Sequence, residues 1–165
     1  MSILDDVFSS RRGQRRVAEF MLRNGISVKS GKLFFSGVEL ADVKVARALD
    51  VDRRVVRTTI DSIEKDKRLK DLYGKLSSTV LLKDVAPVLG FGAIEIVPKN
   101  ASTKGIVASV AKVISEEGIS IRQMITDDPM FSDAEMTVVT EKPIPRALID
   151  KLLAIRGVKK VVVDN

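Results

Sequence analysis

The sequence contains no cysteine, histidine or tryptophan. The lack of cysteine excludes disulfides and thiolate metal sites, and it is typical of proteins of the reducing cytoplasm, where we expect this chain. The lack of histidine removes the side chain that most often acts as a general base or metal ligand. Aromatic residues make up only 4% of the chain, so a stacking platform for single-stranded nucleic acid is not expected.

Other classes of protein are also disfavoured. No apolar run reaches the ~18 residues that a membrane-spanning helix needs, and residues 1–16 lack the apolar stretch of a signal peptide. No glycine-rich phosphate loop is present, so we expect neither an enzyme nor a bound cofactor. The one dense group of carboxylates could ligate Mg²⁺ or Ca²⁺, but it also suits an ordinary loop, and we expect no metal site. This group is Asp127, Asp128, Asp133 and Glu135.

The net charge of +6 is unevenly distributed along the chain. Residues 1–90 carry 18 Lys and Arg against 12 Asp and Glu, whereas residues 91–165 carry 10 of each class. A basic half joined to a neutral half is typical of a polyanion-binding module attached to another domain. Soluble proteins that bind no polyanion also carry an excess of this size, so charge alone does not decide the function.

Residues 43–63, VKVARALDVDRRVVRTTIDSI, predict two helices joined by a tight turn. The first helix ends near Leu49, and Asp52 is a suitable N-cap for the second because its carboxylate can accept a backbone N–H. In the second helix an apolar stripe repeats at spacings of four and three, opposite a largely cationic and polar face. The stripe is Val56, Ile60 and Ile63, and the opposite face is Arg54, Arg57, Thr58, Asp61 and Lys65.

This pattern resembles a helix-turn-helix, whose second helix enters the DNA major groove. An ordinary helical hairpin with a solvated basic face has the same pattern, and the motif needs structural context. Asp61 on the outer face repels phosphate, although a carboxylate can accept from cytosine. On the first interpretation, the side chains that contact bases or phosphates are Arg53, Arg54, Arg57, Thr58 and Lys65.

The rest of the N-terminal half predicts an irregular start over residues 1–12 and a helix over 13–23. A hairpin over 26–35, turning at its Ser-Gly pair, and a further helix through residue 76 are also expected. A basic cluster lies at the start of the first helix, where the helix dipole disfavours cations. A bound phosphate explains this cluster, and so does a plain solvated surface. The cluster is Arg11, Arg12, Arg15 and Arg16.

The C-terminal half alternates strands and helices in the order βαββαβ. Two helices can cover only one face of a four-stranded antiparallel sheet, so the other face and the edges need a partner or polar side chains. Hydrophobic periodicity and glycine or proline stops give the bounds. Strands are predicted over 93–97, 119–126, 135–140 and 158–163, and helices over 103–117 and 143–155.

Two details of this half are specific. The inward face of the helix over 103–117 is expected to comprise Val107, Val110, Ala111 and Ile114. The strand over 119–126 is expected to alternate strictly, with Ile119, Ile121, Gln123 and Ile125 on one face.

The segment KGIVASVAKVISEEGISIRQMI, residues 104–125, resembles the first half of an ACT domain, the small amino-acid-sensing module of metabolic regulators. That family has Pro-Gly-x-Leu at the start of its first helix and Gly-x-Asn-Ile at its second strand. The corresponding segments here are KGIV, from Lys104, and GISI, from Gly118. Lys104 replaces the usual proline and Ser120 the usual asparagine, both at positions where the family contacts its ligand.

Over residues 13–165 the chain resembles an archaeal-type family of predicted regulators of amino-acid metabolism, in which a helix-turn-helix precedes an ACT domain. The resemblance rests on ARALDVDRRVVRTTIDSI followed by the ACT pattern. It implies an α+β chain with a C-terminal ferredoxin-like ACT domain that dimerises. We therefore expect a helix-turn-helix domain with a small hairpin over residues 1–76, a connector over 77–90 and an ACT domain over 91–165.

A ligand site is expected where the first helix of that domain begins. Gly105 lets a ligand approach the backbone closely, and free N–H groups at a helix start bind a carboxylate. Ser120 from a partner's second strand completes the site if the ACT halves pair as in the family. Alternatively, Ser102 or Thr103 is simply an N-cap. The residues expected to bind ligand are Asn100, Ser102, Thr103, Lys104, Gly105, Ile106 and Ser120.

These features predict an amino-acid-responsive transcriptional regulator that is a dimer through its ACT domain. Its expected partners are double-stranded DNA and a free amino acid or similar small effector, with no membrane. The rival hypothesis is a regulatory subunit that does not bind DNA. In that case the ACT half senses an amino acid and the helical half docks on a biosynthetic enzyme.

Overall fold

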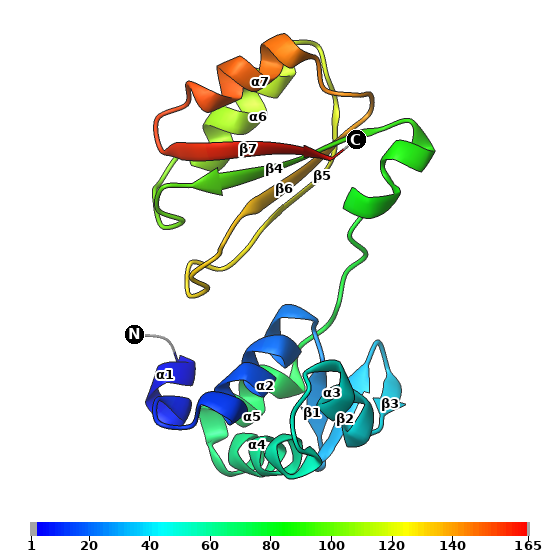
Figure 1. The fold of residues 1–165 in the computed structure, drawn as a ribbon, viewed down its shortest axis with the longest axis vertical. Helices are drawn as coiled ribbons and strands as arrows, with labels where there is room; N and C mark the ends of the chain where they lie inside the picture. Colours follow the sequence, from blue (N-terminus) through cyan, green and yellow to red (C-terminus); the bar gives the residue numbers. More distant parts are fainter. Residues whose placement is uncertain (1–2, 165) are drawn as a thin grey trace. The chain divides into compact units, whose positions relative to one another are not determined.

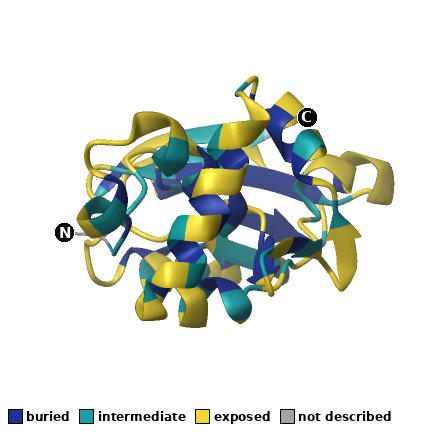
Figure 2. Cartoon of the chain, turned by 90° about the horizontal axis from the view of Figure 1, so that it is seen from below, coloured by how far each residue is buried: buried dark blue, intermediate teal, exposed yellow. Residues whose placement is uncertain are grey.

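The computed structural model describes residues 3–164 and forms two compact units, Met1–Val80 and Leu81–Asn165 (Figure 1). Each unit has its own hydrophobic core. Bands of buried residues alternate with exposed ones along the helices (Figure 2), as expected for helices that pack by one face. No helix in the described part of the chain is long and apolar enough to cross a lipid bilayer.

The N-terminal unit is a cluster of helices with a small antiparallel sheet of strand order β1-β2-β3. The helices share one core with the inner side of the sheet. The helices are α1 (Ile3–Phe8), α2 (Arg12–Arg23), α3 (Asp42–Ala48), α4 (Arg53–Lys65) and α5 (Lys67–Gly74). The strands are β1 (Ser27–Lys29), β2 (Lys32–Phe35) and β3 (Val38–Leu40).

The helix α1 corrects the prediction of an irregular start over residues 1–12. Leu4 and Phe8 lie one turn apart and are 1% and 0% exposed, respectively, within the core of the unit. The prediction is wrong because a helix of 6 residues carries little periodic signal and is stabilised by tertiary packing instead. Residues 1 and 2 of the predicted segment lie outside the described residues.

The predicted hairpin is present, but it is part of a three-stranded sheet. β1 and β2 pair antiparallel around the turn at Ser30 and Gly31, as predicted. The chain then turns again at Ser36 and Gly37, which have φ values of 48° and 84°, and β3 pairs with β2. Strand β3 is not predicted from the sequence, because a strand of three residues is too short to show a clear alternation.

The pair α3 and α4 forms as predicted, with a turn over residues 49–52. The carboxylate of Asp52 accepts a hydrogen bond from the Arg54 backbone N–H at 2.7 Å, which confirms the predicted N-cap. The stripe of Val56, Ile60 and Ile63 is at most 1% exposed and faces the core. The outer face of α4 is therefore fixed by the burial of its inner face.

The chain leaves α5 in close contact with two turns of the same unit. Gly25 follows α2 with a φ of 64°, and a Cβ there would lie 2.5 Å from the backbone carbonyl of Ser77. The hydroxyls of Ser78 and Ser36 are 2.7 Å apart. Only glycine fits at position 25, and residues 77–78 are held against the turns that follow α2 and β2.

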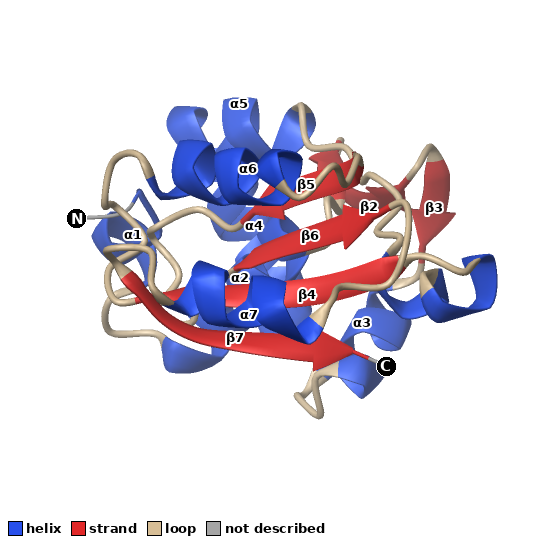
Figure 3. Ribbon diagram, turned by 90° about the horizontal axis from the view of Figure 1, so that it is seen from above, coloured by secondary structure: helices blue, strands red, loops and turns tan. Residues whose placement is uncertain are grey.

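The C-terminal unit has a four-stranded antiparallel sheet of order β5-β6-β4-β7, with α6 and α7 on one face (Figure 3). The element order is the predicted βαββαβ, preceded by two short 3₁₀ helices in the expected connector. The strands are β4 (Gly92–Pro98), β5 (Ile121–Thr126), β6 (Met136–Thr140) and β7 (Val158–Asp164). The helices are η1 (Lys83–Val85), η2 (Pro87–Leu89), α6 (Ile106–Glu116) and α7 (Arg146–Leu153).

The inward face of α6 differs from the prediction at its first position. Gly105 has a φ of 88°, so the helix begins at Ile106 instead of residue 103. Ile106 is 6% exposed and packs in the core, whereas Val107 is 47% exposed. Val110 and Ile114 are buried as predicted. Both apolar residues of the first turn suit a helical stripe, and only the structure decides which one faces the sheet.

The strict alternation predicted for β5 is wrong because a bulge interrupts it. Ile121 lies opposite Thr140 while Gln123 lies opposite Val139, so Arg122 is an extra residue. After the bulge Met124, opposite Val138, faces the helices. A bulge of this kind shifts every later side chain to the other face.

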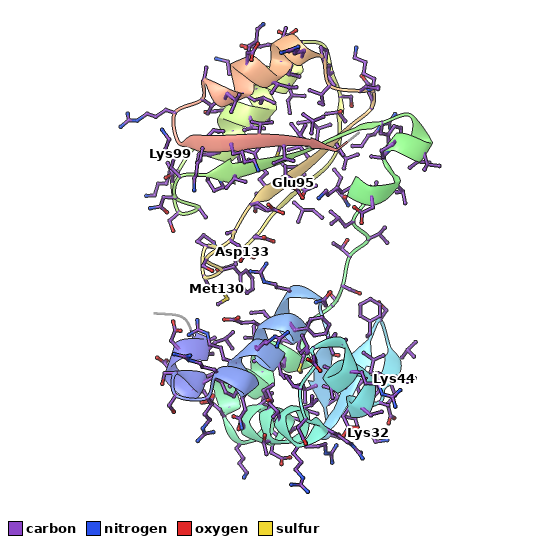
Figure 4. The ribbon with its side chains drawn as sticks, in the orientation of Figure 1. Lys32, Lys44, Glu95, Lys99, Met130 and Asp133 are labelled. Atoms are coloured by element: carbon purple, nitrogen blue, oxygen red, sulfur yellow. The ribbon has the colours of Figure 1, made fainter. Side chains whose placement is uncertain are left out.

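The face of the sheet away from α6 and α7 is partly covered by the segment with η1 and η2. Ala86 packs on Ala93 and Val139 of this face, and all three are at most 1% exposed. Gln123 Oε1 accepts a hydrogen bond from the Leu82 N–H at 2.9 Å. Glu95, labelled in Figure 4, alternates with core residues of β4 and forms an ion pair with Lys83 of η1. The face therefore carries both apolar and charged groups.

We expect the Phe8→Ala variant to lower the free energy of unfolding by about 3–5 kcal/mol, because it removes a fully buried aromatic ring. The matched control is Phe35→Ala, whose ring is 42% exposed and which we expect to cost about 1 kcal/mol or less. Urea denaturation of both variants measures the difference. Equal costs would contradict the packing of α1.

Candidate nucleic-acid surface and ligand cavity

The outer face of α4 presents a set of cationic and polar side chains to solvent. The Asp52 cap fixes where α4 begins, and the buried stripe fixes the rotation of the helix about its axis. The fold therefore sets the direction in which the outer side chains point. Thr58 Oγ1 donates within its own helix, at 2.9 Å from the Arg54 carbonyl oxygen, which leaves its methyl group and lone pairs for a partner. The exposed members of the predicted set are Arg53, Arg54, Arg57, Thr58 and Lys65.

Two of these arginines are paired with an acid that the sequence analysis did not single out. Arg53 Nε lies 3.0 Å from Asp42 Oδ1, and Arg57 Nε lies 3.5 Å from Asp42 Oδ2. The Asp42 side chain is only 10% exposed, while those of Arg53 and Arg57 are 64% and 54% exposed. Asp42 therefore holds the two arginines at their Nε atoms, while more than half of each side chain stays open to solvent.

Arg54 and part of the basic cluster remain unpaired among the described residues. No acidic partner is present there for Arg54, nor for Arg11, Arg12 and Arg16, all of which are exposed. A Cβ at Gly13 would lie 3.3 Å from Val55 Cγ1, so the start of α2 packs against the first turns of α4. The two predicted sets of cations are thus carried by neighbouring segments of the unit.

Arg15 differs from the rest of its cluster. Its guanidinium lies 2.6 Å from Asp5 and 2.8 Å from Glu19, which ties α1 to α2. The hydrogen bond to Glu19 is the main reason that the pKa of Arg15 is raised. We assign Arg15 to this internal network, because its Nε and Nη1 atoms are already paired with Glu19 and Asp5.

The turn between β1 and β2 is bonded to α4. The Gly31 N–H donates to Glu64 Oε1 at 3.0 Å, and Lys70 lies 2.7 Å from Glu64 Oε2. The hydrogen bond from Lys70, followed by the one from Gly31, lowers the pKa of Glu64. The hairpin tip, with Lys29 and Lys32 beside it, is thereby held next to the C-terminal half of α4. Sequence patterns gave no signal for this contact, because the partners are 33 residues apart.

The C-terminal unit has a cavity of about 140 Å³ where β4 ends, α6 begins and the β5–β6 loop passes. This is smaller than the ~300–1,000 Å³ of sites for drug-sized ligands, so it suits a small molecule. The lining combines apolar walls with two threonines and two carboxylates. The principal apolar residues are Pro98, Ile106, Pro129 and Met136, and the polar ones are Thr103, Thr126, Asp127 and Glu135. Figure 4 labels Met130 and Asp133 on the same loop.

Only two of the residues expected to bind ligand line this cavity, Thr103 and Ile106. Asn100 Oδ1 accepts the Ser102 N–H at 2.9 Å in a local turn, and Lys104 and Gly105 are exposed beside it. Ser120 precedes β5, while the cavity lies at the other end of that strand, beyond Thr126. A single chain therefore does not bring Ser120 to the cavity.

From the sequence, the carboxylates of the cavity wall suit either a metal ion or an ordinary loop, and no metal site is expected. Burial, followed by the charges of Glu95 and Asp127, raises the pKa of Glu135. Such a site favours a cationic group over an anionic one. Within residues 3–164, no three His, Cys, Asp or Glu side chains are grouped so that they could hold a metal ion. The Asp127 backbone N–H also donates to the Glu135 carbonyl oxygen at 2.9 Å, next to the last β5–β6 pair.

Comparisons with known proteins found only low similarity to this chain. No family model and no curated protein matches it. An AsnC family transcriptional regulator from Agrobacterium tumefaciens is 11% identical, with a TM-score of 0.32 over 93% of this chain and 87% of that one. The protein PH0061 is 17% identical, with a TM-score of 0.29 over 92% and 88% of the two chains. At these scores the similarity supports no conclusion about function.

We expect the Glu135→Gln variant to be more stable than the unaltered chain at pH 7. The native state raises the pKa of Glu135 above its ordinary 4.5, so the ionised carboxylate destabilises the native state at neutral pH. Below pH 4.5 the group is protonated in the unfolded state as well, and the difference should disappear. Thermal unfolding at pH 7 and pH 4 measures this. The control is Asp133→Asn, an equal charge change at an exposed site; a gain as large there would refute the explanation.

Proposed function

We propose that the chain is a transcriptional regulator that binds double-stranded DNA through α3 and α4. The carrying observation is that α4 buries one side and presents Arg54, Arg57 and Lys65 outward, next to the cationic start of α2. A helix with these properties, preceded by a short helix and a tight turn, suits the major groove. Arg54 is the strongest candidate for a base contact, because its guanidinium has no acidic partner among the described residues.

We further propose the division of labour expected from the sequence, with DNA bound by residues 1–76 and a sensing, ACT-like domain over 91–165. The cavity beside α6 supports a small effector such as a free amino acid. Backbone N–H groups at the start of α6 suit its carboxylate, and Asp127 and Glu135 suit its ammonium group. The limited volume favours a small side chain.

A homodimer through the C-terminal unit completes this proposal. In the described sheet, β5 and β7 are edge strands that have no second neighbour. Apolar side chains in the segment around η1 and η2 are exposed to solvent, and clustered exposure of this kind is typical of an interface. They are Leu81, Val85, Val88 and Leu89, at 46%, 44%, 87% and 52% exposed. A dimer brings two copies of α4 to two DNA half-sites.

DNA binding is tested with duplexes selected from a random pool by the unaltered chain. We expect Arg54→Ala to relax sequence preference by about 1–3 kcal/mol, and Arg12→Ala to weaken all duplexes alike and flatten the salt dependence. Fluorescence anisotropy at several salt concentrations measures both effects.

The matched control is Arg156→Ala, an exposed arginine of the C-terminal unit, which should leave DNA affinity unchanged. If the unaltered chain binds no duplex at low salt and instead co-purifies with an enzyme at fixed stoichiometry, the rival function as a regulatory subunit holds.

Effector binding is tested by thermal unfolding of the full chain with each of the twenty amino acids. A ligand at 100 times its dissociation constant should add about 2.7 kcal/mol to the stability. Asp127→Asn should abolish the shift, whereas Asp133→Asn, on the same loop but outside the cavity lining, should retain it. No shift with any amino acid would contradict this part of the proposal.

A further inference from the structure

Asp42 is a buried acid placed beneath the cationic face of α4. It is the first residue of α3, and its carboxylate is nearly enclosed, with 10% of the side chain exposed. Its two charged neighbours, Arg53 and Arg57, come from the first two turns of α4. A carboxylate that only balanced surface charge would not need to be enclosed. Its burial between two helices makes its position rigid.

The two carboxylate oxygens have different roles. Oδ1 accepts hydrogen bonds from the Val43 N–H at 2.9 Å and from Arg53 Nε at 3.0 Å. Oδ2 is buried and accepts no hydrogen bond from the described residues, although Arg57 Nε is 3.5 Å away. Arg53 is thus bonded directly, while Arg57 is held mainly by charge.

Both arginines are held through Nε, which leaves their terminal amino groups for a partner. Those groups, fixed in one plane, are the ones that can pair end-on with two acceptors, such as O6 and N7 of guanine. An arginine fixed at its base loses less side-chain entropy on binding than a free one. The carboxylate also removes one unit of positive charge from a pair that carries two.

We propose that Asp42 is a positioning residue that sets the selectivity of DNA binding by orienting Arg53 and Arg57 and by reducing their attraction to phosphate. This inference rests on the proposed binding of double-stranded DNA. Affinity for the phosphate backbone is independent of sequence and grows with the number of free cations. Base recognition depends instead on the orientation of the arginine side chains. A buried acid beneath two arginines weakens their attraction to phosphate and improves their orientation toward the bases.

The test compares Asp42→Asn with the unaltered chain on a selected duplex and on a scrambled one. Asparagine has nearly the same shape and can still accept from Val43 and Arg53, so we expect the variant to fold. The scrambled duplex should bind more tightly and the selected one more weakly. The ratio of the two affinities should fall about tenfold, which lies within the range for one good bidentate base contact. Asp42→Glu, which restores the charge, should recover part of the ratio.

Two matched variants exclude simpler explanations. Asp71→Asn makes the same change in net charge at an exposed site on α5, and it should leave the ratio unchanged. Arg53→Lys keeps the charge but loses the guanidinium plane, so it should lower the ratio, and the double variant with Asp42→Asn should lower it little further.

The outcomes separate the two proposals. If the unaltered chain discriminates between the duplexes and Asp42→Asn retains the ratio, with only a lower melting temperature, Asp42 has a purely structural role and this inference is overturned. If the unaltered chain binds neither duplex, the proposed function fails and this inference fails with it. A fall in the ratio for Asp42→Asn, absent in Asp71→Asn, supports it.

Discussion

The burial of one side of α4 is the constraint on which the N-terminal unit depends. Val56, Ile60 and Ile63 are essentially inaccessible to solvent, and each stabilises the fold by about 1.5–3 kcal/mol through burial. Turning α4 by one residue, about 100°, so that the next position along the chain faces inward would expose these side chains and bury Arg57, Asp61 and Glu64 in their place. The direction of the cationic face is therefore a consequence of core packing, and contacts such as Asp42 with Arg53 refine an orientation that is already set.

The C-terminal unit follows a different logic, because a sheet has two faces and the helices cover one. The other face carries Glu95 and Glu135, whose negative charges repel each other, and Lys83 is the compensating cation. The segment with η1 and η2 covers the apolar pair Ala93 and Val139 on this face. Glu135 also lines the cavity, so this repulsion acts at the end of the sheet where the cavity opens.

The parts that the sequence predicts well are those with a long hydrophobic period. Helix α4 and the βαββαβ order follow from such patterns and from glycine stops. Helix α1 and strand β3 do not, since each is too short to show a period and depends on contacts with distant residues. The bulge at Arg122 is likewise invisible, because nothing in the local pattern marks an extra residue.

The candidate sites show the same limit. The outer face of α4 could be predicted because exposure on a helix follows from its own periodicity. Asp42 could not be assigned a role, because it lies on the preceding helix and reaches α4 only through packing. Of the residues expected to bind ligand, only Thr103 and Ile106 line the cavity, whereas Asp127 and Glu135 reach it through the antiparallel pairing of β5 with β6.

The close contact between Gly25 and Ser77 has a mechanical consequence. A force applied to the chain beyond Ser78 acts first on the turns after α2 and β2, because residues 77 and 78 contact those turns. Tension in the segment that follows is therefore borne first by these two turns.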